Sequence, residues 1–193
     1  MMPLPSPSIR LMEYISVVCS LVSLYADIKQ HLSARFFALF SSFFSLYVLY
    51  SEALYGSCLL VMLMIGLHSY GIYVWVWVTH TQPKPAITRL KKKICYGMVT
   101  IGSLAAYLLS FVLSYLGQKN FSTLDGWNAI FSLIATWLLV QKKLETWILW
   151  IFISISYFFI FLKLNLYGFA LLQIVYLVLN LWGNYTWRKA TPN

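Results

Sequence analysis

A row of polar side chains interrupts the apolar C-terminal segment of the chain. The polar residues recur at i, i+3, i+7 and i+11, which places them on one face of a helix: Gln173, Tyr176, Asn180 and Asn184. Amides and phenols are costly in lipid, so this face is expected to point into the interior of a helical bundle. The pattern indicates a polar pocket for a small ligand. Hydrogen bonding between helices, which also buries amides, is the alternative.

Two tryptophans stand on the apolar segment that precedes this row. Trp147 and Trp150 share one helical face with Ser154 and Tyr157. Aromatic rings of this kind stack on a flat cationic ring and attract its charge. An aromatic belt at the membrane surface also explains Trp147, which lies near the end of its segment, but it explains Trp150, about one turn deeper, less well.

His68 stands in the middle of the third apolar segment. We expect a neutral hydrogen-bonding residue there, with a proton-binding site as the alternative. The acidic residues stand near segment ends, where solvation at the membrane surface explains them: Glu13, Asp27, Glu52, Asp125 and Glu145. Because no carboxylate is expected at mid-span, transport coupled to a proton or sodium gradient is not expected.

Enzyme chemistry is not expected from this sequence. It has no pair of carboxylates within a segment, no HExxH motif, no Gly-rich phosphate loop and no convincing Ser/His/Asp set. Cys19, Cys58 and Cys95 lie in apolar runs without a CxxC, so we interpret them as small buried hydrophobes. We therefore predict no catalytic residues, no metal site and no cofactor.

The composition defines the class of protein that must position these residues. Of the 193 residues, 61% are hydrophobic and 10% charged, and the mean hydropathy is +0.75. Soluble domains average about 25% charged residues, so a soluble or disordered chain is excluded. The net charge of +9 fits basic cytoplasmic loops in a membrane protein better than a nucleic-acid partner.

Seven apolar segments approach or exceed the length of about 20 residues that crosses a bilayer: 12–28, 35–51, 54–79, 94–117, 124–141, 147–163 and 165–187. Their continuous apolar character predicts helices rather than a β-barrel. No cleaved signal peptide is expected before the first segment.

The basic residues predict the orientation of these segments. Three of them, Arg10, Lys119 and Lys163, stand on the side of the N-terminus. Eleven stand on the other side, including Arg35 and several in the loop 80–93. The positive-inside rule therefore predicts an outer N-terminus and a cytoplasmic C-terminus.

An internal repeat relates the two ends of the chain. Residues 20–75 align without a gap with residues 132–187, and 14 of the 56 positions are identical. LYGSCLL and YGIYVW in the first copy match LYGFALL and WGNYTW in the second. Each copy holds three segments and the segment 94–117 lies between them. An even number of crossings then separates matching positions, so the repeats are expected to be parallel, with the substrate at their interface near mid-membrane.

These motifs resemble those of the PnuC-type nicotinamide riboside transporter family, also called nicotinamide mononucleotide transporter PnuC. The similar motifs are LDGWNAIFSLIA at 124–135, KKLETWILW at 142–150 and LYGFALLQIVYLVLNLWGNYTW at 166–187. The resemblance covers about 13–79 and 123–189. It implies a facilitator whose substrate is trapped inside the cell by phosphorylation.

The resemblance also implies roles for individual residues. Trp147 and Trp150 would stack on the pyridinium of nicotinamide riboside, and Gln173 and Asn180 would bind its ribose. The chain departs from the family pattern at Val61 and His68, where many members have Gln and Asn, and at Thr146, where Asn is common. These departures concern the identity of the substrate rather than the fold.

The fold expected is an all-α integral membrane domain spanning 1–193. It has two parallel three-helix repeats, 13–79 and 123–189, joined by a central helix at 94–117, a SWEET-like 3+1+3 plan. The function expected is transport of nicotinamide riboside by facilitated diffusion, with Trp147, Trp150, Gln173, Tyr176, Asn180 and His68 as substrate-binding residues. Thiamine or riboflavin transport in the same family, and a SWEET-like sugar facilitator, are alternatives, and a membrane enzyme or assembly subunit is a third class.

The expected setting is a bacterial inner membrane that the chain crosses several times. The expected partners are the small-molecule substrate and the lipid bilayer, and nucleic acid is not expected. The sequence leaves the oligomeric state open, and a homo-oligomer is among the states that it allows.

Overall fold

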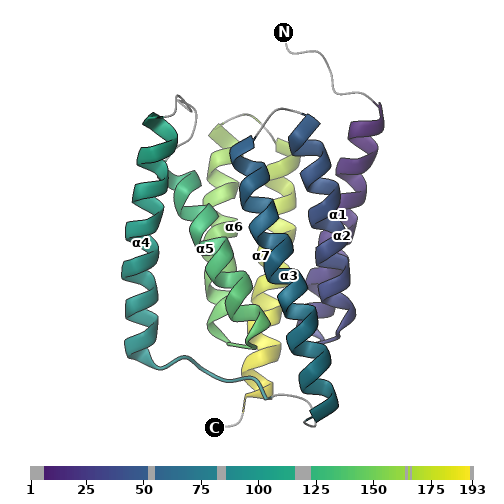
Figure 1. Ribbon diagram of the computed structural model, residues 1–193, viewed down its shortest axis with the longest axis vertical. Coiled ribbons are helices and arrows are strands. Elements are labelled where there is room, and N and C mark those ends of the chain that lie inside the picture. The colour runs from purple at the N-terminus through teal and green to yellow at the C-terminus, as the bar shows by residue number, and fades with distance from the viewer. Residues whose placement is uncertain are drawn as a thin grey trace. The chain divides into compact units, whose positions relative to one another are not determined.

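The structure of the chain is a computed structural model. It describes residues 7–51, 55–81, 86–115, 123–163, 165 and 167–191. These residues form seven α-helices (Figure 1): α1 (Pro7–Ile28), α2 (Ser33–Ser51), α3 (Tyr55–Thr81), α4 (Lys92–Tyr115), α5 (Thr123–Val140), α6 (Glu145–Lys163) and α7 (Tyr167–Ala190). Some residues of the sequence analysis lie outside the described ranges: Glu52, Leu54, Lys84, Lys119 and Leu166.

Each helix is long and apolar enough to cross a membrane. The helices have 18 to 27 residues, which at 1.5 Å per residue gives about 27–40 Å, close to the thickness of the hydrocarbon core. The prediction of an all-α protein with seven spans is confirmed, and most bounds differ by one to three residues. The largest difference is at α1, which begins five residues before the expected segment 12–28, so Glu13 lies in its second turn.

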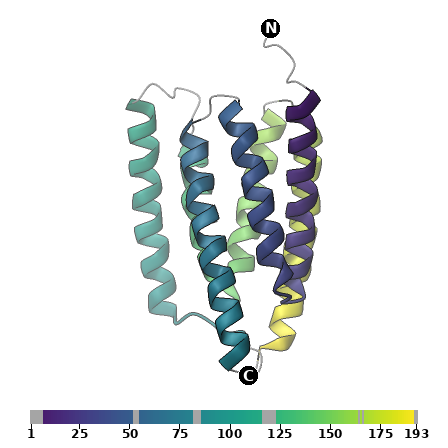
Figure 2. The same ribbon diagram turned by 45° about the vertical axis from the view of Figure 1, so that its right-hand side comes forward.

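The chain divides into two compact units, Met1–Pro85 with α1 to α3 and Ala86–Asn193 with α4 to α7. In the first unit α2 packs against both α1 and α3, and Figure 2 shows α1 and α2 side by side. Ser16 donates a hydrogen bond to the carbonyl oxygen of Ser41 (3.0 Å), and Ser41 donates one to that of Ser16 (2.9 Å). Small hydroxyl side chains thus let these two helices approach closely.

The turn after α1 and the turn after α5 have the same backbone geometry. Gln30 and Lys142 both have left-handed φ values, 56° and 50°. The amide of the next residue, His31 or Lys143, donates to the carbonyl oxygen five residues back at 2.9 Å. This pattern is a Schellman motif, which satisfies the last carbonyl groups of a helix and reverses the chain. Because Gln30 and Lys142 are 112 residues apart, both turns stand at the same position of the aligned repeats.

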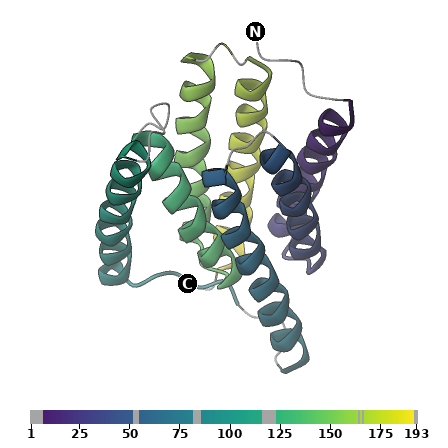
Figure 3. The same cartoon turned by 45° about the horizontal axis from the view of Figure 1, so that its top comes forward.

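In the second unit, α4 packs against α5, α5 against α6, and α6 against α7. Figure 3 shows α6 and α7 side by side. The contact between α4 and α5 depends on small residues, because a Cβ atom at Gly126 would overlap Ser110 and lie 2.9 Å from the carbonyl oxygen of Ala106. Ala106 and Ser110 are both buried, so these small side chains let α4 and α5 approach closely.

The segment 86–91 is fastened to the turn between α5 and α6. The amide of Thr88 donates to the carbonyl oxygen of Lys142 and the amide of Leu144 donates to that of Thr88, both at 3.1 Å. The amide of Leu90 donates to Oε1 of Glu145 at 3.0 Å. These bonds hold the start of α4 beside the start of α6.

Candidate functional site

The polar face of α7 contacts α6 through Asn180. This side chain is buried, and its Nδ2 donates a hydrogen bond to Oγ of Ser154 at 3.2 Å. Its Oδ1 is also buried and has no hydrogen-bond partner among the described residues. A buried carbonyl oxygen without a partner is costly, by about 1–3 kcal/mol, so Asn180 keeps one acceptor available for a ligand that can donate.

The other polar residues of the face are less buried. Gln173 and Tyr176 are half-buried. Asn184 is half-buried as well, and its Oδ1 accepts a hydrogen bond from Nε of Arg188 at 3.1 Å. The burial of the polar face thus varies along α7. Gln173 and Tyr176 are half-buried, Asn180 is buried, and Asn184 is half-buried and paired with the exposed Arg188.

Trp147 is one of the most deeply buried side chains of the protein, with no exposed surface. Its ring lies edge-on to Trp187 on α7, with the ring centroids 5.3 Å apart. A Cβ atom at Gly183 would overlap the six-membered ring of Trp147. In this structure Trp147 therefore fills the α6–α7 interface, with no ring face open to a ligand and no role in an aromatic belt.

Trp150 differs from Trp147 because its ring is half-buried. It packs against a small apolar cluster formed by Phe131, Ala135 and Ile153. Part of the side chain therefore remains exposed, while the rest packs against the cluster. A ring fixed in this way can stack on a ligand with little loss of side-chain freedom.

His68 lies on α3 in the first unit, whereas α6 and α7 belong to the second unit. The side chain is half-buried, and its Nδ1 is buried without a hydrogen-bond partner among the described residues. His68 and Asn180 are 112 residues apart and so occupy the same position of the aligned repeats. Each keeps one buried polar atom without a partner.

The structure corrects the sequence analysis at Asp27 and Arg35. Arg35 was counted among loop cations and Asp27 among solvated acids, but both are buried and form an ion pair between α1 and α2. The guanidinium of Arg35 also lies 5.2 Å from the ring centroid of the buried Trp75 on α3. Removing Arg35 from the eleven leaves ten basic residues against three, so the predicted orientation keeps its basis.

A signal for this ion pair was present in the alignment of the repeats. Arg35 aligns with Trp147, Asp27 with Leu139, and Trp75 with Trp187. Two opposite charges in one repeat thus replace two apolar residues that are buried in the other. Charged residues at two positions that are apolar in the matching copy indicate a buried pair, because a lone buried charge is far more costly.

No group of three or more His, Cys, Asp or Glu side chains within the described ranges could hold a metal ion. The three cysteines are free. What the described residues offer is therefore hydrogen bonding and aromatic surface inside an apolar helical framework, which suits binding of a small organic molecule.

Seven apolar helices with buried amide and aromatic groups define a multi-pass helical membrane protein. The chain belongs to the nicotinamide mononucleotide transporter family, whose model matches residues 10–190. It is therefore a membrane transporter of the class that carries NAD precursors, and the family resemblance seen in its motifs is confirmed.

A solved structure agrees with this fold. The chain is similar to the crystal structure of the vitamin B3 transporter PnuC, with a TM-score of 0.76 and 21% sequence identity over 93% of this chain and 81% of that one. At this identity the likeness concerns the fold. A comparison with curated proteins gives no match.

Proposed function

We propose that the chain is a facilitator for nicotinamide riboside, which it lets pass down its concentration gradient. Phosphorylation inside the cell would then trap the product. The proposal agrees with the placement of the described acidic residues, since Glu13, Asp27, Asp125 and Glu145 all lie within two turns of a helix end. A carrier driven by protons or sodium commonly uses a carboxylate deeper in the membrane.

The unpaired Oδ1 of Asn180 is the observation that carries the proposal. It is buried on α7 while Nδ2 of the same amide is held by Ser154. This hydrogen bond fixes the direction of the amide, so the acceptor is positioned before a substrate arrives. A ribose hydroxyl is a suitable donor, and binding one would remove the cost of the unpaired oxygen.

Trp150 is proposed to bind the cationic pyridinium ring through its accessible ring face. Trp147, which was expected to share this role, is proposed to support it by fixing α6 against Gly183 and Trp187. Gln173 and Tyr176 are proposed as further contacts on the face of α7 that carries Asn180. Neutral His68 is proposed as a further hydrogen-bonding contact, because its Nδ1 has no partner in the described part of the chain.

The repeat plan and the setting of the protein belong to the same proposal. We assign 13–79 and 123–189 as two parallel three-helix repeats, with 94–117 as the helix that joins them. The matching Schellman turns at Gln30 and Lys142 support this assignment. The proposed setting is a bacterial inner membrane with the N-terminus outside and the C-terminus in the cytoplasm.

Uptake into proteoliposomes tests the substrate. The purified protein would be offered labelled nicotinamide riboside together with unlabelled competitors: nicotinamide mononucleotide, thiamine, riboflavin and sucrose. The proposal expects uptake to stop at equal concentrations on the two sides and to be inhibited by unlabelled nicotinamide riboside more than by any other compound. Stronger inhibition by one of the other four compounds would identify that compound, instead of nicotinamide riboside, as the preferred substrate. Absence of flux for every compound would contradict the role as a facilitator.

A further inference from the structure

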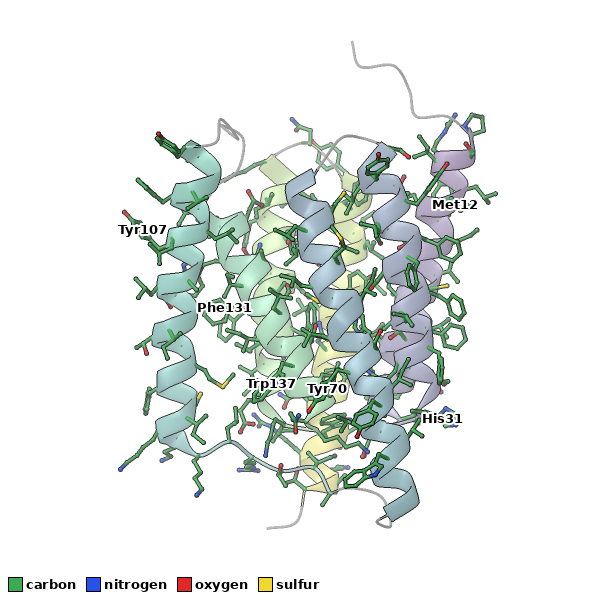
Figure 4. The ribbon with its side chains drawn as sticks, viewed as in Figure 1. Met12, His31, Tyr70, Tyr107, Phe131 and Trp137 are labelled. Atoms are coloured by element: carbon green, nitrogen blue, oxygen red, sulfur yellow. The ribbon has the colours of Figure 1, made fainter. Side chains whose placement is uncertain are left out.

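The second unit contains an apolar groove that the proposed transport function does not use. It has a volume of about 510 Å³ and lies among α4, α5 and α6. Phe131 lies on the side of α5 that faces α4 (Figure 4) and forms part of its wall. Val99, Leu124 and Phe152 also line the groove and are exposed, so the groove opens at the surface of the unit.

The groove is elongated along the helices. Its lining residues on α5 extend from Leu124 to Leu138, which at 1.5 Å per residue is about 21 Å. One leaflet contributes about half of the 30 Å hydrocarbon core, or about 15 Å. The groove is therefore long enough for an extended acyl chain. The helices α4, α5 and α6 are candidate membrane spans, and a bilayer supplies acyl chains of this length.

Basic residues stand at one end of the groove. Leu90 lines it and stands within a basic run whose other members are all exposed: Arg89, Lys91, Lys92 and Lys93. The hydrogen bond from Leu90 to Glu145 places this run at the start of α6. Cations that border an apolar groove between membrane helices suit a phosphate at the level of the lipid head groups.

Glu145 provides a second polar feature at this end. Glu145 lines the groove. Its Oε1 is occupied by the amide of Leu90, while its Oε2 is buried and has no partner within the described ranges. An unpaired carboxylate oxygen requires a hydrogen-bond donor. Four cations and one carboxylate give this end of the groove a net positive charge, which is complementary to an anionic head group. The unpaired oxygen of Glu145 further favours a head group that carries a hydrogen-bond donor.

We propose that this groove is a binding site for an anionic phospholipid, phosphatidylglycerol being the head group that fits both features. One acyl chain lies along Phe131 and Val99, the phosphate contacts the basic run, and a glycerol hydroxyl donates to Oε2 of Glu145. The bound lipid fills the space between α4 and the α5–α6 pair. It thereby stabilises the position of α4, whose one packing partner among the described helices of its own unit is α5.

Lipid-dependent thermal stability of the purified full chain in detergent tests the site. Phosphatidylglycerol is expected to raise the melting temperature in a saturable way and phosphatidylcholine is not, because a ligand that binds the folded state stabilises it by mass action. Lys92→Gln combined with Lys93→Gln should weaken the apparent affinity for phosphatidylglycerol about 30-fold. The control pair is Lys29→Gln with Lys163→Gln, which removes two exposed charges elsewhere and should leave that affinity unchanged.

A second pair of variants tests the groove itself. Val99→Trp fills it, whereas Val112→Trp adds the same bulk at an exposed position of α4 outside the lining. Val99→Trp should abolish the phosphatidylglycerol response and Val112→Trp should preserve it. A response that survives Val99→Trp would reduce the site to surface electrostatics and overturn the proposal. Equal shifts in melting temperature with phosphatidylglycerol and phosphatidylcholine would also overturn the proposal. So would a dimer that forms without lipid and that Val99→Trp dissociates, because it would show that a second copy of the chain occupies the groove.

Discussion

Ser23 donates its hydroxyl to the backbone carbonyl oxygen of Ala34 at 2.9 Å, a buried contact between α1 and α2. The same contact occurs 112 residues later with the donor exchanged, since Thr146 donates to the carbonyl oxygen of Ala135 at 2.8 Å. Ser23 aligns with Ala135, and Ala34 aligns with Thr146. The hydrogen bond therefore joins the same two aligned positions in both copies, although the residue types at both positions differ. In each case the hydrogen bond joins the two helices that flank a Schellman turn, α1 with α2 and α5 with α6.

The ion pair between Asp27 and Arg35 provides a first prediction. Arg35→Met should destabilise the protein strongly, by about 3–5 kcal/mol, because it leaves a buried carboxylate without its partner. Asp27→Leu combined with Arg35→Met should recover most of this loss, since Leu139 and Trp147 show that apolar residues fit the matching positions. Thermal unfolding of both variants measures the difference. A double variant no more stable than Arg35→Met would indicate that the charges do not act as a pair.

The contact between Gly183 and Trp147 provides a second prediction. Gly183→Ala should destabilise the protein by about 1–3 kcal/mol, because the added methyl group overlaps the ring of Trp147. Gly168→Ala on the same helix is the control, because a Cβ atom there meets no atom within 4 Å. The control should be neutral or slightly stabilising, as alanine favours helix. Unfolding curves that coincide for the two variants would argue against close packing at Gly183.

The sequence predicted the helices better than it predicted the contacts of single residues. Continuous apolar runs of about 20 residues identify spans directly, and the polar face of α7 follows from its spacing. The buried state of Arg35 was missed, because composition places an arginine near a span end in a loop. Trp147 was similarly assigned to a ligand, since nothing on α6 alone reveals that Gly183 leaves space for its ring. Such contacts depend on residues far apart in sequence, and only alignment of the two repeats hinted at them.

The distribution of basic residues provides a third prediction, on orientation. Single cysteines introduced at Gln82 and Lys119, in a background lacking Cys19, Cys58 and Cys95, should react with a membrane-impermeant reagent from opposite sides of the membrane. The loop at 80–93 carries the larger positive charge and should be cytoplasmic. Labelling of intact cells and of inverted vesicles measures this accessibility. Reaction of both cysteines from one side would contradict the seven-span topology.

The placement of the acidic residues provides a fourth prediction, on energy coupling. Uptake of the substrate into proteoliposomes should persist when an ionophore collapses the proton and sodium gradients, because no described carboxylate lies at mid-span. His68→Gln keeps hydrogen-bonding capacity without a titrating ring and should retain uptake. A steep loss of uptake with protonophore, together with an inactive His68→Gln variant, would instead indicate a carrier coupled to protons through this histidine.

The amide of Asn180 provides the last prediction. Asn180→Ala removes the acceptor proposed for the ribose and should weaken substrate binding about five- to 150-fold, the equivalent of about 1–3 kcal/mol. Asn184→Ala is the matched control on the same helix, because its oxygen is already bonded to Arg188, and it should change binding little. Trp150→Leu keeps apolar bulk but removes the ring face, so it should weaken binding of a cationic ligand more than that of a neutral analogue.

Stability measured on the same variants separates binding from packing. The hydrogen bond between Asn180 and Ser154 joins α7 to α6, so Asn180→Ala also removes a contact between helices, which in membranes averages about 0.6 kcal/mol. The loss in binding should therefore exceed the loss in stability. If Asn180→Ala lowers the melting temperature and leaves affinity intact, the amide serves only to hold the two helices together. Equal losses for the cationic and neutral ligands in Trp150→Leu would likewise assign that ring to packing, because a cation–π contribution depends on the charge of the ligand.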